Sequence, residues 1–139
     1  DSDFLWRCDV EEVLGFYNEN YAVSCVQHDY TPKSDTKMDG VIQTSYPRKN
    51  WSSLMMFNCE HPDTQKLSVE VVNTESPKYL HRMSWTDEVG SIPLTYNYLE
   101  GDYEYIDYPK VIHFTNGGPW HKTWDGDYSE LWVKEYNDL

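Results

Sequence analysis

The amino-acid sequence predicts an α/β fold built from a few short strands with flanking helices, on three observations. Runs rich in β-branched and aromatic residues, which are typical of strands, alternate with segments whose apolar residues recur at helical spacing. Helix-start signals precede several of those segments. No internal repeat, low-complexity stretch or linker divides the 139 residues. We therefore expect a single domain over residues 1–139.

Strands are expected where β-forming runs lie between polar loops. The four runs are residues 21–26, 52–59, 92–99 and 111–115. Residues 52–59 are apolar without alternation, as in a strand that is buried on both faces. Asp1 to Phe4 reads as the end of a further strand. Because a parallel sheet needs helices on both faces and this chain supplies few, we expect the strands to be part of a larger sheet.

Helices are expected where capping residues precede apolar stripes. Asp9 and Glu12 have the form of a capping box before a short helix. Pro62 and Pro77 stand at plausible first positions of two more helices. A last helix is expected to begin within residues 125–127, where two aspartates carry charges that favour a helix N-terminus.

Acidic residues outnumber basic ones by 24 to 11, which gives a formal net charge of −13. Such a field repels a phosphate backbone, so no nucleic acid is expected as a partner. An enzyme that handles phosphate groups would need local positive charge at its site. A divalent cation held by some of the surplus carboxylates supplies it.

No apolar run approaches about 18 residues, so no segment is expected to span a membrane. The three cysteines, Cys8, Cys25 and Cys59, include no C-x-x-C pair, which argues against a zinc ribbon or thioredoxin-like chemistry. Each lies in or beside an apolar stretch, so buried reduced thiols are expected. Reduced thiols favour a reducing compartment, and we therefore expect a cytoplasmic location.

Two aspartates open the sequence as Asp1-Ser2-Asp3. Carboxylates at positions i and i+2 of an extended chain point to the same side. At the carboxyl end of a strand they face the crevice in which α/β proteins bind ligands. Two such carboxylates can hold Mg²⁺ or Mn²⁺, which in turn bridges a diphosphate. Taken alone, the pattern is weak evidence, because a solvated acidic pair explains it better.

A second polar segment follows the strand expected at residues 111–115. It places His113 near the end of that strand, Gly117 and Gly118 in a turn, and Lys122 shortly afterwards. An imidazole can complete the oxygen-rich shell of a manganese ion, so we expect a metal ligand at His113. Backbone N–H groups exposed at glycines form an anion cradle. Phosphate contacts are therefore expected from the two glycines and Lys122; a structural histidine at a strand end is the alternative.

Together the two segments resemble family 8 of the GT-A glycosyltransferases. In that family a D-x-D and a distant H-x-x-G-x-x-K-P-W bind a divalent metal and the diphosphate of a UDP-sugar. Asp1 and Asp3 match the first motif. His113, a glycine and Pro119-Trp120 match the second.

The resemblance extends through the middle of the chain. Residues 46–58 look like a variant of the family's F-N-x-G-hydrophobic-I-N segment, and residues 86–98 look like its D-Q-D…L-P…W-N stretch. All the matching segments stand in the family's order, from Asp1 to about Trp124. An ordered set of this kind is more specific than any one motif.

The resemblance implies a partial GT-A sheet with flanking helices, without the N-terminal nucleotide-binding half, so this chain alone is expected to be an inactive fragment. It implies metal-dependent transfer of a sugar from a nucleoside-diphosphate donor, in the first place UDP, to a carbohydrate acceptor with retention. Asp1, Asp3 and His113 would hold Mn²⁺ or Mg²⁺. Asp87, with Glu88 as second candidate, would hold donor-sugar hydroxyls or steady positive charge at the anomeric carbon. A structural role for Asp87, as a negative charge that stabilises a helix N-terminus, explains its presence almost as well.

The second motif is one residue short of the family pattern, and Gly118 stands where the family has a lysine. The missing positive charge would come from the metal or from Lys122, Arg48 or Lys49. Two other functions stay open. The aromatic content of 16% fits a non-catalytic carbohydrate-binding module. The acidic pair with His113 fits a metal-dependent hydrolase of nucleotide sugars.

Overall fold

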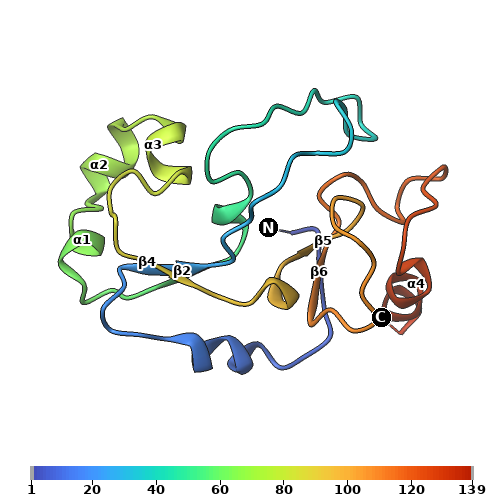
Figure 1. Cartoon of the computed structure of the whole chain (residues 1–139), viewed down its shortest axis with the longest axis horizontal. Helices are drawn as coiled ribbons and strands as arrows, with labels where there is room; N and C mark the ends of the chain where they lie inside the picture. Colours follow the sequence, from blue (N-terminus) through green and yellow to red (C-terminus); the bar gives the residue numbers. More distant parts are fainter. Residues whose placement is uncertain (1, 139) are drawn as a thin grey trace. The chain divides into compact units, whose positions relative to one another are not determined.

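The computed structural model describes residues 2–138, which form two compact units (Figure 1). Unit 1 consists of residues 2–8, 30–45 and 95–138, and unit 2 of residues 9–29 and 46–94. Each contains a sheet of three strands in which parallel and antiparallel pairs are mixed. The predicted α/β class is therefore confirmed. The described strands form two separate three-stranded sheets, and the expectation that they are part of a larger sheet stays a prediction.

The sheet of unit 1 has the strand order β1-β6-β5. The bounds are Phe4–Trp6 for β1, Tyr98–Leu99 for β5 and Val111–His113 for β6. β6 runs antiparallel to β1 and parallel to β5. The start of β1 and the carboxyl ends of β5 and β6 therefore lie along the same edge of the sheet. The expectation that the opening aspartates end a strand is wrong, since Asp3 directly precedes β1.

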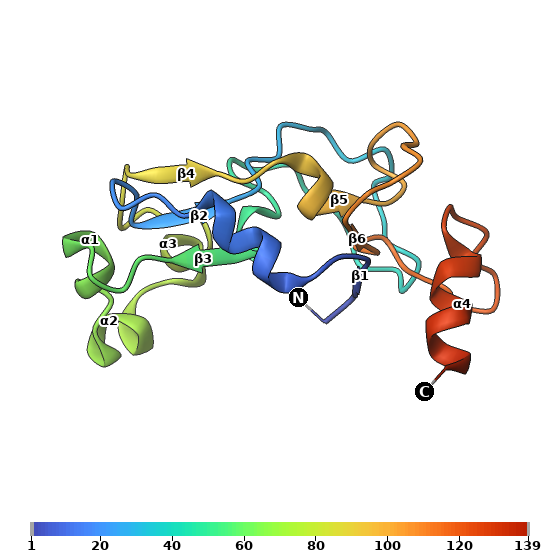
Figure 2. The same cartoon turned by 90° about the horizontal axis from the view of Figure 1, so that it is seen from below.

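The core of unit 1 lies between this sheet and α4, which spans Ser129–Asn137 (Figure 2). The core residues are aromatic or aliphatic: Leu5, Tyr98, Ile112, Phe114 and Tyr128. α4 begins later than residues 125–127, because Tyr128 has a left-handed backbone with φ of 64° and only the residues after it are helical.

The sheet of unit 2 has the order β3-β2-β4. The bounds are Val23–Cys25 for β2, Met55–Phe57 for β3 and Val89–Ser91 for β4. β2 is the central strand and is buried along its whole length, whereas β3 is an edge strand that is only half-buried. The expectation that residues 52–59 are buried on both faces is therefore wrong, and Phe57 is exposed and stacks on Trp85.

Three short helices follow β3, and α1 and α2 lie beyond one end of the sheet (Figures 1 and 2). The bounds are Pro62–Gln65 for α1, Val69–Thr74 for α2 and Pro77–His81 for α3. The predicted prolines do begin α1 and α3. Ser68 accepts a hydrogen bond from the Val71 N–H and so begins α2 as a separate helix.

Two further expectations are met only in part. Asp9 does cap a helix by accepting a hydrogen bond from the Glu11 N–H, but Val10–Phe16 is a 3₁₀ helix. The strand expected at residues 92–99 is interrupted by a 3₁₀ turn at Leu94–Tyr96, and only its last two residues are extended and paired. A third short 3₁₀ turn, Trp51–Ser53, precedes β3.

The cysteines differ in environment. Cys25 is buried in the core of unit 2, and burial raises the pKa of its thiol to about 12, so it stays protonated. Cys59 is exposed, which makes the expectation of burial wrong for that residue. Among the helices of residues 2–138, none is long and apolar enough to cross a bilayer, as expected.

A buried carboxylate in unit 1 provides a test of the core. Glu100 is 4% exposed, and its Oε1 accepts a hydrogen bond from the Asp127 N–H at 3.0 Å. Burial raises the pKa of Glu100, and repulsion from Asp127 and Asp102 adds to the effect. Because the folded state holds this proton more tightly than the unfolded state, stability falls as pH rises from the ordinary pKa of 4.5 through the raised value.

We therefore expect Glu100→Gln to raise the melting temperature at neutral pH, because glutamine keeps an acceptor oxygen and removes the buried charge. The difference from the wild type should shrink as the pH is lowered toward the ordinary carboxyl pKa. Thermal melts across this pH range measure both effects. A variant that melts at or below the wild-type temperature at neutral pH would contradict the expectation.

Candidate functional site

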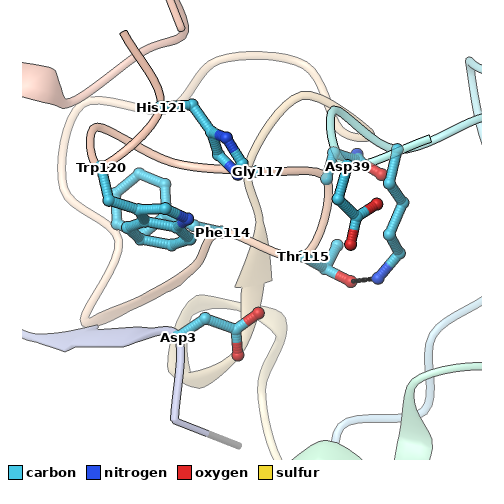
Figure 3. Close-up of a pocket in the computed structure, with 9 residues that line it drawn as sticks. Asp3, Asp39, Phe114, Thr115, Gly117, Trp120 and His121 are labelled. Atoms are coloured by element: carbon cyan, nitrogen blue, oxygen red, sulfur yellow. Dashed lines mark hydrogen bonds between the residues drawn. The ribbon is translucent and has the colours of Figure 1, made fainter. Parts of the chain in front are cut away.

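A cavity of about 150 Å³ opens in unit 1 where β1 begins and β6 ends. Figure 3 shows the Asp3 carboxylate beside it, with Trp120 and His121 on one side and Asp39 and Thr115 on the other. Its lining residues are Asp3, Lys37, Asp39, Phe114, Thr115, Asn116, Gly117, Trp120 and His121. The volume is below the roughly 300–1,000 Å³ of drug-sized ligand pockets, and suits a phosphate-sized group.

Strand pairing brings Asp3 to His113. Phe4 lies opposite His113 in the β1–β6 register, and the Phe114 N–H donates to the Asp3 carbonyl at 3.0 Å. The Asp3 Oδ1 and the His113 Nε2 are consequently 3.3 Å apart. His113 is 1% exposed and its ring meets the Phe4 ring edge-on, whereas Asp3 is partly exposed at the cavity. Two residues that the sequence predicts as metal ligands are therefore in contact.

Burial and the pair interaction fix the charges of these two groups. The hydrogen bond from His113 holds the pKa of Asp3 below its ordinary value, against the opposing effect of burial. Burial lowers the pKa of His113, and this outweighs the attraction of the Asp3 carboxylate. At neutral pH the pair is therefore an ionised carboxylate beside a neutral imidazole.

The other ring nitrogen of His113 faces a buried amide. Its Nδ1 lies 3.0 Å from the Oδ1 of Asn97, which is fully buried. When Nδ1 carries the ring proton, it donates to Asn97, and the Nε2 lone pair faces the Asp3 carboxylate. When Nε2 carries the proton, it donates to Asp3 instead. The first tautomer places one nitrogen and one oxygen lone pair close together, and these could serve as two of the ligands of a divalent cation.

The two glycines predicted to bind phosphate form a tightly packed turn. Gly117 has a φ of 132°, and a Cβ there would lie 2.8 Å from the Met38 Cγ. A Cβ on Gly118 would lie 2.3 Å from the Trp120 ring. The Gly117 N–H donates to the Phe114 carbonyl at 3.2 Å, so in this conformation it closes the turn. Both glycines thus have a packing role, and their phosphate contacts stay a prediction.

The loop of residues 30–45, for which the sequence predicts no functional role, completes the cavity. The Met38 N–H donates to the Asn116 carbonyl at 3.0 Å, and the Gln43 Nε2 donates to the Asn116 Oδ1 at 2.7 Å. The Asn116 Nδ2 in turn donates to Asp102, which is buried. These contacts hold residues 30–45 against the turn that follows β6, and so place Lys37 and Asp39 at the cavity. No spacing rule connects this loop to His113, because the contacts are long-range.

The remaining predicted residues lie elsewhere. Lys122 is exposed and does not line the cavity, and Asp1 lies outside the described residues. Asp87 and Glu88 belong to unit 2, where both are exposed and line a separate cavity of about 340 Å³. Within residues 2–138 there is no group of three or more His, Cys, Asp or Glu side chains placed to hold a metal.

The cavity of unit 2 has a short polar network beside the two carboxylates. The Thr86 Oγ1 donates to the Asp63 Oδ2 at 2.7 Å and accepts from the Glu88 N–H at 3.0 Å. Lys66 forms an ion pair with Asp63. The network fixes the backbone of Glu88, while its carboxylate extends to solvent.

Arg48 and Lys49, predicted as alternative phosphate contacts, also lie in unit 2. The Arg48 Nη1 donates to the carbonyls of Arg82 and Met83 at 2.9 and 3.0 Å, and its guanidinium lies over the Trp51 ring. These contacts give Arg48 a structural role. The Lys49 Nζ lies 5.2 Å from the centre of the Tyr46 ring.

Comparison with known proteins finds similarity to Protein CDI of Arabidopsis thaliana, at 47% identity over 146 residues. The similarity covers 99% of this chain and 56% of the relative, so the chain spans little more than half of that protein's length. No family model and no solved structure matches the chain.

The Gly117 contact gives a testable prediction. We expect Gly117→Ala to lower the free energy of unfolding by about 1–3 kcal/mol, because alanine is strained at this φ and its Cβ meets Met38. Urea denaturation measures the change. Gly15→Ala is the matched control, since an added Cβ there meets nothing within 4 Å. Equal stabilities for the two variants would contradict the packing described for this turn.

Proposed function

We propose that this chain carries the metal-binding, catalytic part of a glycosyltransferase that moves a sugar from a nucleoside-diphosphate donor to a carbohydrate acceptor. One observation carries the proposal. Asp3, which lines a phosphate-sized cavity, lies 3.3 Å from His113, a buried residue 110 positions away in the sequence. Their contact supports the pairing of a D-x-D with a distant histidine that the resemblance to GT-A family 8 implies.

The donor set fits a divalent cation of the Mn²⁺ or Mg²⁺ type. Asp3 supplies a carboxylate oxygen and His113 an imidazole nitrogen, and Asp1 would add a second carboxylate. Oxygen donors with one imidazole suit Mn²⁺ in particular. A bound cation would act as a Lewis acid that stabilises negative charge on the departing diphosphate.

The chain's own residues supply positioning around this cation. The Asn97 Oδ1 can accept a hydrogen bond from the His113 Nδ1, and the tautomer with the proton on Nδ1 would leave Nε2 available as a ligand. Phe4 packs edge-on against the same ring, which is buried. Retention at the anomeric carbon, the choice of UDP and the roles of Asp87 and Glu88 follow from the resemblance and belong to the proposal.

The α/β fold weighs against the non-catalytic module. Carbohydrate-binding modules are usually all-β sandwiches, whereas this chain has two small mixed sheets with helices. A metal-dependent hydrolase would use the same two ligands. The products distinguish transfer from hydrolysis: a transferase attaches the sugar to an added acceptor, whereas a hydrolase releases it as free sugar.

Metal binding is the first test. We expect Asp3→Asn to weaken Mn²⁺ binding, measured by calorimetry, by about tenfold or more, because the neutral amide is a poor ligand. Asp107→Asn removes the same charge at an exposed position of unit 1 that does not line the cavity, and should bind Mn²⁺ like the wild type. Equal loss in both variants would indicate only a general effect of charge and would overturn the site.

Turnover is the second test. Turnover is measured on this chain joined to the nucleotide-binding half that the resemblance implies. With Mn²⁺ and a panel of UDP-sugars, we expect release of UDP that an added oligosaccharide acceptor accelerates. Asp87→Asn should lower kcat with unchanged Mn²⁺ affinity, and Glu88→Gln is its matched comparison. A rate of UDP release that no added acceptor changes would favour the hydrolase. Release that is unaffected by Asp87→Asn would remove that residue from the mechanism.

A further inference from the structure

The cavity beside Asp3 poses an electrostatic problem for a phosphate ligand. Asp3 and Asp39 both line it, and the whole chain carries a net charge of −13. Among the described side chains that line it, Lys37 is the one lysine or arginine. The cations expected from the sequence do not serve here, since Lys122 does not line the cavity and Arg48 binds backbone carbonyls of unit 2.

The position of Lys37 is fixed by its neighbours. Its Nζ donates to the Thr115 Oγ1 at 3.2 Å, and Thr115 is buried two residues after the end of β6 (Figure 3). Its N–H donates to the Val41 carbonyl and its carbonyl accepts from the Gly40 N–H, both at 2.9 Å. The ammonium group is therefore held at the cavity by a closed turn and a buried hydroxyl.

The field of Lys37 also reaches the proposed metal ligands. Its charge contributes to the lowering of the pKa of Asp3 and of His113, behind the larger effects of their mutual hydrogen bond and of burial. Lys37 and Asp3 line the same cavity, so one bound ligand can contact both side chains.

We propose that Lys37 is the phosphate-binding cation of this site, and that it takes the place of the lysine that the turn after His113 lacks. The inference rests on the proposed function and adds a residue to it. Two aspartates and one lysine line the cavity, so its acidic side chains outnumber Lys37. A bound divalent cation reverses that sign, so the diphosphate binds after the metal and contacts both the metal and Lys37.

This arrangement predicts opposite effects on two ligands. Loss of the Lys37 charge removes repulsion toward a metal cation, so Mn²⁺ binding should be unchanged or tighter. The same loss removes a charge-assisted hydrogen bond to phosphate, so UDP binding in saturating Mn²⁺ should weaken by about tenfold or more. A variant that is merely misfolded would lose both ligands together.

The test uses calorimetry on the wild type and three variants, with Mn²⁺ alone and then UDP in saturating Mn²⁺ as probes. Lys37→Met should show the opposite effects, and Lys37→Arg should keep most of the UDP affinity. Lys122→Met is the matched control and should bind both probes like the wild type. Uridine is a third probe, and its binding should not depend on Lys37.

Each contrary outcome has a distinct meaning. If Lys37→Met binds UDP like the wild type, the assignment of Lys37 is overturned while the transferase proposal stands. If Lys37→Met loses Mn²⁺ and UDP together, Lys37 has a structural role only, and the inference is again overturned. If the wild type binds neither Mn²⁺ nor UDP, both proposals fail.

Discussion

The pairing of β1 with β6 is the constraint on which the site depends. The antiparallel register sets Phe4 opposite His113, so the residue before β1 meets the residue that ends β6. A slip of one residue in this register would turn His113 to the other face of the sheet and separate it from Asp3. The same pairing supports the core under α4, because Leu5 and Ile112 lie opposite one another in it and both are buried. Stability of unit 1 and geometry of the site are therefore linked.

The turn after β6 and the loop of residues 30–45 form the cavity beside Asp3. Gly117 allows Met38 to approach closely, and Asn116 holds the loop of residues 30–45 through its carbonyl and its side chain. Asp102 anchors Asn116 from beneath. Without these contacts the loop would lie in solvent, and Lys37 would have no fixed place. The loop is thus a part of the site, although its sequence is mostly polar and matches no motif.

The features that sequence analysis predicted well are local. The prolines that begin α1 and α3 and the β-branched run of β6 act within a few residues, and the structure follows them. The contact of Asp3 with His113 was expected from motif resemblance, because a motif records a long-range contact that local patterns do not. The alternation that would have marked β3 as an edge strand is absent from its apolar residues, so its half-buried state was missed.

The main feature that the sequence did not predict depends on tertiary contacts, and two others are local. The docking of residues 30–45 needs Met38 and Gly117 to meet, and nothing in the spacing of those residues indicates it. The 3₁₀ turn before β5 follows Pro93. The β-forming residues around Pro93 led to the prediction of a continuous strand. The prediction places the opening aspartates at the end of a strand and not before β1, because so few residues carry no pattern that shows where a strand begins.

The central claim is that Asp3 and His113 bind one cation, and pulsed electron paramagnetic resonance of Mn²⁺ added to the protein tests it most directly. The account predicts a coupling between the manganese electron spin and an imidazole nitrogen, which disappears in His113→Gln. A manganese centre that shows only oxygen ligands, or a nitrogen coupling that survives the loss of His113, would contradict it.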